Sequence, residues 1–214
     1  MTASSGVAVD NLGDKLVKAG VRVVRLGHPA RISESLHSFS LSVLIKEERD
    51  NFEEVKIQVE ELREKLHSKW TKLGPSDRRF EEDQLNALIR QRDDSLTKIE
   101  RLSSIFILEA HVVLATLTGC KRRGPLKYLP DNYFNTTVID ECGQALEMAC
   151  WIGIHKSPKL ILAGDHHQLA PTVISKKKNV KEKLSVSLME RLGERFSDGT
   201  VIHMLKVGFD YIIS

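Results

Sequence analysis

Four short, nearly continuous apolar runs in the second half of this 214-residue chain restrict its fold more than any other feature. Strands buried on both faces of a parallel sheet have this pattern, whereas a strand with one solvated face alternates apolar and polar residues. Residues 144–152 and 184–196, between the runs, have the spacing of helices. This alternation predicts an α/β fold with a parallel sheet and right-handed crossovers. The runs are H-V-V-L-A-T-L-T (111–118), T-V-I-D (137–140), K-L-I-L-A-G-D (159–165) and T-V-I-H-M-L (200–205).

Residues 1–45 predict a helix followed by a strand. Val9, Leu12 and Leu16 recur at helical spacing, and Gly20 is suited to end the helix. The segment V-R-V-V-R-L-G, ending at Gly27, then reads as a strand.

Residues 46–107 form a charged zone that predicts two antiparallel helices packed along a narrow seam. One apolar stripe consists of Val55, Val59, Leu62 and Leu66, and a second of Leu85, Leu88, Leu96, Ile99 and Phe106. The sequence L-G-P-S-D, residues 73–77, separates the helices, with Ser76 or Asp77 as a candidate cap. The pattern fits a spacer or a protein-docking arm as well as a nucleic-acid contact.

Polar side chains gather where the predicted strands end. Ligands of parallel sheets bind at the carboxyl ends of the strands, where these side chains meet. Adjacent carboxylates at Asp140 and Glu141 repel each other unless a dication offsets their charge. In P-loop NTPases an aspartate in this place helps to hold magnesium, and a neighbouring carboxylate can activate water. The alternative is a helix N-terminus with favourable acids. The other polar residues at the strand ends are Thr116, Thr118, Asp165 and Gln168.

Asp165 and Gln168 follow the third apolar run and are candidates to contact a γ-phosphate or the water beside it. A metal site at His166–His167 is disfavoured, because adjacent loop residues point apart and no H-x-x-x-H pair completes it.

Composition leaves the partner open, since the net charge is +3 and the pI about 8.7. Basic runs occur at residues 121–123 and 176–178. Three cysteines without a C-x-x-C pair fit a reducing compartment, and we expect a cytoplasmic or nuclear protein. No apolar run reaches about 18 residues and no signal peptide is evident, so no membrane partner is expected.

Several motifs in order resemble the superfamily-one DNA/RNA helicases related to the nonsense-decay helicase, and within them the S-mu-binding helicases. V-I-D-E-C-G-Q-A-L-E (138–147) resembles motif II, and L-A-G-D-H-H-Q-L-A-P (162–171) resembles motif III. Further likenesses are A-S-S-G-V-A-V-D-N-L (3–12) to motif Ia, V-R-L-G-H-P-A-R-I (24–32) to the segment after it, and V-V-L-A-T-L-T-G (112–119) to motif Ic.

The resemblance implies a RecA-like P-loop NTPase fold and a helicase motor that uses ATP and Mg²⁺ on single-stranded DNA or RNA. Residues 1–45 and 108–205 would form most of the first motor domain, 46–107 a helical insertion open to protein partners, and 206–214 a divergent tail. Asp140 would bind magnesium, Glu141 would be the catalytic base and Gln168 a γ-phosphate sensor, with Asp165 beside them. The residues that would contact the nucleic-acid backbone are Ser5, Asn11, Thr116 and Thr118.

The chain also departs from the pattern of that family. Gly6, Gly143, His167 and Ala170 stand where the family usually has asparagine, alanine, a basic residue and proline. No G-x-x-x-x-G-K-[ST] loop occurs, and the likeness ends after Met204. We therefore expect a partial motor that is inactive alone. The alternative is a shortened, non-catalytic module that binds nucleic acid or protein.

Overall fold

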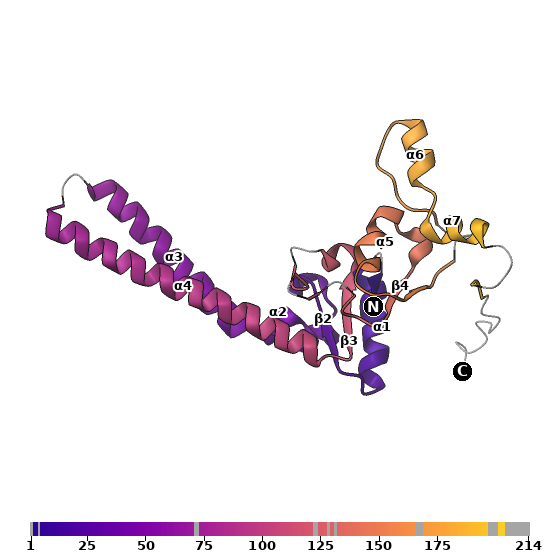
Figure 1. The fold of residues 1–214 in the computed structure, drawn as a ribbon, viewed down its shortest axis with the longest axis horizontal. Coiled ribbons are helices and arrows are strands. Elements are labelled where there is room, and N and C mark those ends of the chain that lie inside the picture. The colour runs from indigo at the N-terminus through magenta and orange to yellow at the C-terminus, as the bar shows by residue number, and fades with distance from the viewer. Residues whose placement is uncertain are drawn as a thin grey trace. The chain divides into compact units, whose positions relative to one another are not determined.

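The computed structural model describes residues 2–3, 5–70, 73–121, 124–127, 129–130, 132–165, 169–196 and 201–203. The chain divides into two compact units, which are described separately. The first unit comprises residues 6–130 and the second comprises residues 2–5 with 131–214. Figure 1 follows the chain by colour from its first residue to its last.

The first unit contains a two-stranded parallel sheet and most of the helical residues. Strands β2 and β3 pair in parallel, with Val24 opposite Val113. Gly20 has φ +73° just after α1, so the predicted end of this helix and the strand after it are confirmed. The elements are α1 (Gly6–Lys18), β2 (Val23–Arg25), η1 (Pro29–Arg31), η2 (Glu34–Phe39), α2 (Leu41–Leu44), α3 (Lys46–Lys69), α4 (Pro75–Glu109), β3 (Val112–Thr116) and η4 (Leu117–Cys120).

Helix α1 lies very close to its neighbours in the first unit because Gly13 faces them. A Cβ atom at Gly13 would lie 2.6 Å from a methyl carbon of Leu36 and 2.9 Å from one of Leu114. These distances leave no room for a side chain. The glycine thus allows α1 to pack directly on η2 and β3.

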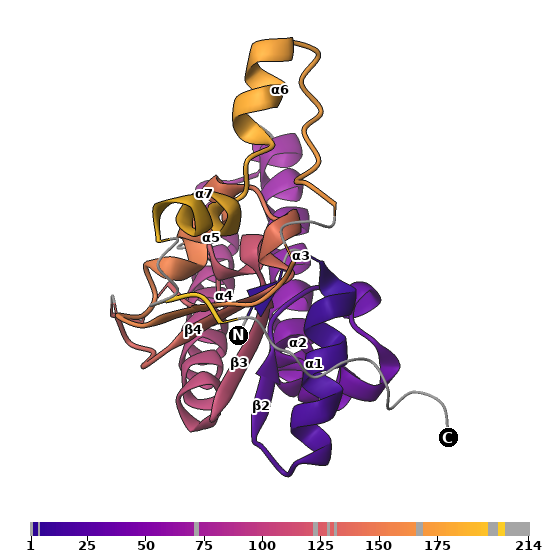
Figure 2. The same ribbon diagram turned by 90° about the vertical axis from the view of Figure 1, so that its right-hand side faces the viewer.

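Helices α3 and α4 form an antiparallel hairpin, side by side in Figures 1 and 2. Lys65 Nζ lies 2.8 Å from Glu81 Oε1, and a second ion pair joins Lys98 to Glu48. The first predicted stripe is confirmed, since it contains the three buried residues of α3, Val55, Val59 and Leu66.

The second predicted stripe is partly wrong. Leu96 is exposed, and the buried positions of α4 are Ser95, Ser103 and Ile107. Adjacent residues point about 100° apart on a helix, so Ser95 and Leu96 cannot share the seam. Asn51 Nδ2 donates to Ser95 Oγ at 3.5 Å, which gives the buried hydroxyl a partner across the seam.

The predicted cap of α4 is also wrong. Gly74 is the N-cap and Pro75 occupies the first turn, so Ser76 and Asp77 lie inside the helix. Proline favours the first helical position because its ring fixes φ and it has no N–H to leave unpaired.

The second unit contains a three-stranded parallel sheet, which confirms the predicted parallel strands at 137–140 and 159–165; the strand at residues 2–3 was not predicted. Ile139 lies opposite Thr2 on one side and Leu162 on the other. The elements are β1 (Thr2–Ala3), β4 (Thr137–Asp140), η5 (Cys142–Gln144), α5 (Glu147–Ile154), β5 (Leu160–Leu162), α6 (Lys178–Leu184) and α7 (Leu188–Arg195).

Three details of this unit differ from the sequence prediction. Residues 201–203 of the fourth apolar run are not in a strand and are exposed; its other residues lie outside the described part of the chain. A strand needs pairing partners to be stable, and no pairing forms for 201–203. Helix α5 starts at Glu147 because η5 precedes it. Ser187 and Glu190 form a capping box, so residues 184–196 contain the end of α6 and a separate helix α7.

None of the helices in the described residues is both long and apolar enough to cross a membrane.

Candidate active site

Three parallel strands of the second unit bring polar residues to one edge of their sheet. Ser5 follows β1, Asp140 ends β4 and Asp165 follows β5. Because Thr2, Ile139 and Leu162 are in register, the three strand ends meet at the same edge. The prediction that these polar residues collect at the carboxyl ends is confirmed for this unit. Gln168 lies outside the described residues.

Glu141 has an unusual backbone conformation. Its φ of 52° and ψ of 34° lie in the left-handed region, which costs a residue with a side chain about 1–2 kcal/mol. Among the described residues, Asn132 is the only other non-glycine with positive φ. Such strain persists where the surroundings hold it, and it is concentrated at functional sites.

Hydrogen bonds donated by backbone N–H groups hold this strained turn. Asp140 Oδ1 accepts from the Glu141 N–H at 2.9 Å, and the Cys142 N–H donates to the Ala163 carbonyl at 3.0 Å. The Ala163 N–H in turn donates to the Ile139 carbonyl at 2.8 Å. The turn after β4 and the loop after β5 are therefore joined directly.

Gly164 makes this junction possible. Its φ is +146°, and a Cβ atom there would lie 3.1 Å from the backbone N of Cys142 and 3.2 Å from that of Gly143. Any side chain would be strained and would push on the turn that carries Asp140 and Glu141. Asp165, the next residue, is exposed.

Gln144 is a site residue that sequence reasoning missed. Its Nε2 donates to Glu141 Oε2 at 3.1 Å, and both side chains are partly buried. The signal was present in D-E-x-x-Q, because residues three apart align in a 3₁₀ turn. The amide holds one carboxylate oxygen of Glu141, and the other oxygen takes no part in this bond.

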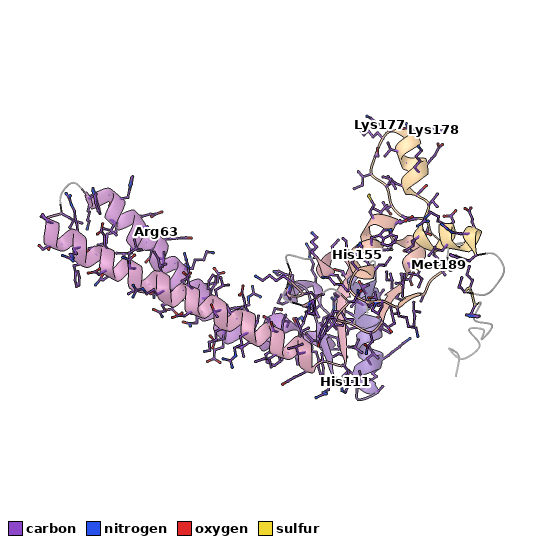
Figure 3. All side chains as sticks on the ribbon, viewed as in Figure 1. Arg63, His111, His155, Lys177, Lys178 and Met189 are labelled. Atoms are coloured by element: carbon purple, nitrogen blue, oxygen red, sulfur yellow. The ribbon has the colours of Figure 1, made fainter. Side chains whose placement is uncertain are left out.

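Helix α7 is attached to the same turn. Arg191 donates to both carboxylate oxygens of Glu147, at 2.6 and 2.8 Å, and these bonds lower the pKa of Glu147. Cys142 Sγ lies 3.4 Å from Met189 Sδ, and Ser187 bridges Leu146 in antiparallel fashion. Figure 3 labels Met189 on this helix.

The buried thiols beside the site should be unreactive. Burial raises the pKa of Cys142 to about 12, with further contributions from Cys150 and the two nearby carboxylates. Burial is the main cause that raises the pKa of Cys150 to about 11, and the nearby carboxylate of Glu147 makes a smaller contribution. At pH 8 we expect iodoacetamide to label both at least about tenfold more slowly in the native chain than in urea. Peptide mass spectrometry measures the rates, and equal rates would contradict the burial.

The same shifts fix the sign of a pH effect on stability. Because the folded state favours the neutral thiols, their contribution is complete below the ordinary pKa of 9.0 and is lost as the pH rises toward 11–12.

The other predicted nucleic-acid contacts lie in the first unit. Asn11 is exposed on α1, and Thr118 is exposed in η4. Thr116 Oγ1 accepts from the Gly119 N–H at 3.2 Å and lies 3.4 Å from Thr118 Oγ1. The two threonines therefore form one hydroxyl pair. The structure gives the positions of these side chains, and their contact with nucleic acid stays a prediction.

A buried ion pair fixes the helix that carries Asn11. Arg25 Nε donates to Asp10 Oδ1 at 2.7 Å, and the two side chains are only 2% and 8% exposed. The other carboxylate oxygen accepts from the Ser33 N–H at 2.7 Å, and a second guanidinium nitrogen donates to the Leu26 carbonyl at 2.7 Å. The pair joins α1 to β2 and to the loop before η2.

Parallel strands with an aspartate at the end of one of them are a feature that this chain shares with P-loop NTPases. A family model described as "AAA domain" matches residues 1–176. The chain belongs to this family of RecA-like P-loop domains, in the group of superfamily-one helicases that contains SMUBP-2 and upf1.

Similar curated proteins carry names that agree with this family. The chain is 40% identical over 210 residues to "DNA-binding protein SMUBP-2" of Rattus norvegicus, covering 97% of the chain and 20% of that protein. It is 38% identical over 190 residues to "DNA polymerase alpha-associated DNA helicase A" of Schizosaccharomyces pombe, covering 88% and 26%. It is 34% identical over 193 residues to "ATP-dependent helicase upf1" of the same yeast, covering 89% and 18%. The chain spans about a fifth to a quarter of the length of these relatives.

Proposed function

We propose that the chain supplies the carboxylate half of the ATPase site in a motor that moves along single-stranded DNA or RNA. The observation that carries this proposal is the turn after β4, where Glu141 is held in a left-handed conformation and its carboxylate accepts from Gln144. Membership of a helicase family supports the assignment to ATP.

In this proposal each polar residue of the sheet edge has one task. Asp140 binds Mg²⁺, which suits a site of one or two carboxylates completed by phosphates and water. The ion would supply positive charge that offsets the adjacent carboxylates and the phosphates. Glu141 accepts the proton of the attacking water, and Gln144 keeps its carboxylate oriented. Gln168 and Asp165 contact the γ-phosphate or that water.

Nucleic-acid backbone contacts are proposed for four polar residues at the ends of β1 and β3, on α1 and in η4. Hydroxyl and amide groups bind phosphates without reading base sequence. Ser5, Asn11, Thr116 and Thr118 are assigned to this task. For the charged hairpin of α3 and α4 we propose an accessory role as a docking arm for a protein partner.

A chimera tests the proposed function. This chain replaces the matching stretch of the ATP-dependent helicase upf1 of S. pombe, to which it is 34% identical. We expect ATP hydrolysis that single-stranded nucleic acid stimulates, measured as phosphate release. A folded chimera without turnover, beside an active parent, would refute the proposal.

We propose a second role, strand binding without turnover, for the 214-residue chain taken by itself. Its sequence contains no G-x-x-x-x-G-K-[ST] loop to hold the phosphates. The purified chain should therefore release no phosphate above background. Turnover that disappears in Glu141→Gln would contradict this second role.

A further inference from the structure

A strongly basic segment lies between the loop after β5 and helix α7. We define the lysine segment as residues 176–183, which contain five lysines and one glutamate, a net charge of +4. Its lysines are exposed, and α6 has no buried residue. Figure 3 shows Lys177 and Lys178 at the outer end of α6. The lysines are Lys176, Lys177, Lys178, Lys181 and Lys183.

The positive charge of this segment is scarcely neutralised by the protein. Lys178 Nζ lies 3.9 Å from Glu182 Oε1, with the two side chains 91% and 65% exposed. This is the one ion pair of the segment in the described part of the chain, and such an exposed pair contributes little free energy. Like charges close together on a short helix repel each other. A polyanion would relieve that repulsion.

The chain returns to the turn that carries Asp140 and Glu141 on either side of the segment, twelve residues before it and six residues after it. Upstream, the Ala163–Gly164 loop contacts this turn through backbone atoms. Downstream, helix α7 contacts it through Met189 and is joined to α5 by the Arg191–Glu147 pair. Both contacts lie in the second unit, so the segment and the carboxylate turn belong to one compact unit.

One large apolar side chain near the lysines in sequence is also exposed. Ile174 is 94% exposed, close in sequence to Lys176. A single-stranded nucleic acid presents phosphates together with unstacked bases, and so matches both features. Anionic lipid has a related chemistry, and the experiment separates the two.

We propose that the lysine segment binds the phosphate backbone of a single-stranded nucleic acid, which extends the binding surface beyond the strand-end residues. This inference rests on the proposed function. It places a strand contact in the same compact unit as the carboxylate turn.

Salt-dependent binding to the 214-residue chain tests the lysine segment. Fluorescence anisotropy with labelled oligothymidylate and oligouridylate gives the affinity between about 50 and 200 mM salt. The variant Lys176→Ala/Lys177→Ala/Lys178→Ala should bind roughly tenfold more weakly at about 100 mM salt. The slope of log affinity against log salt should fall by about 2, since each single-strand phosphate contact contributes about 0.7. Circular dichroism checks the fold.

The matched control removes three lysines of the hairpin, Lys46→Ala/Lys56→Ala/Lys69→Ala, and so changes the net charge equally. Binding within twofold of the unaltered chain is expected for this control. Equal weakening in both triple variants would overturn the proposal, because general charge would then explain the binding.

Other outcomes separate this inference from the proposed function. If the segment variant binds normally while Asn11→Ala binds several-fold more weakly, the segment proposal fails and the proposed function stands. If the unaltered chain binds neither oligonucleotide, the strand-binding part of the proposed function fails as well. Lysine-dependent binding to phosphatidylserine vesicles without oligonucleotide binding would assign the segment to a membrane surface and overturn the proposal.

Discussion

Glutamine in place of Glu141 is expected to lower the ATP turnover of the upf1 chimera by about 10²–10⁴-fold, the usual contribution of a general base. The amide has nearly the shape of the carboxylate and cannot accept the proton of the attacking water. Binding of ATP should remain, because the substitution removes one negative charge and no phosphate contact. Phosphate release under saturating ATP measures the first effect, and a fluorescent ATP analogue measures the second.

Two further variants show whether the geometry of the turn matters. Gln144→Ala removes the amide that donates to Glu141 Oε2, and should lower turnover about tenfold through loss of orientation. Gln144→Glu removes the donor and places another carboxylate beside Glu141, so it should lower turnover at least as much as Gln144→Ala does. Glu194→Gln, an exposed acid on α7, is the matched control and should leave turnover unchanged. Full turnover in Glu141→Gln would exclude this residue as the base.

Continuous apolar runs made the parallel sheets predictable. Val112–Thr116, Thr137–Asp140 and Leu160–Leu162 are strands where the sequence predicts them. The position of Asp140 follows from this, because a carboxylate directly after such a run must lie at the strand end. The length and apolar character of each run are local properties of the sequence and were sufficient to locate the strands, although Leu160–Leu162 are not buried on both faces as the runs predict.

Tertiary contacts decided the features that the sequence did not predict. The left-handed backbone of Glu141 depends on the Cys142 N–H bond to Ala163, which lies on a different strand end. The seam of α4 is centred on Ser95 rather than Leu96 because a residue of α3, Asn51, reaches it. The apolar spacing of residues 184–196 predicts a single helix, but the capping box at Ser187 begins a separate helix, α7. The first two outcomes depend on a partner distant in sequence, whereas the capping box joins Ser187 to Glu190 only three residues away.

Asparagine in place of Asp10 should reduce the free energy of unfolding by about 3–5 kcal/mol, the range for removing one partner of a buried ion pair. The side chains of Asp10 and Arg25 are 8% and 2% exposed, so water cannot solvate the guanidinium that remains. The hydrogen bonds of the Asp10 carboxylate add to this loss of unfolding free energy. Both carboxylate oxygens accept a hydrogen bond, one from Arg25 and one from the Ser33 N–H. An asparagine has one oxygen, so its NH₂ group would face a donor.

Urea unfolding followed by far-ultraviolet circular dichroism measures this loss in the 214-residue chain. Glu53→Gln is the matched control, because its partner Lys56 is 45% exposed and exposed pairs contribute little. A control change below about 0.5 kcal/mol beside a large change for Asp10→Asn would show that burial, not charge pairing alone, sets the cost. The double variant Asp10→Leu/Arg25→Met removes both charges and should recover part of the loss, since no unpaired charge stays buried. A change below about 1 kcal/mol for Asp10→Asn would mean that water reaches Arg25, and that α1 is held mainly by its close packing at Gly13.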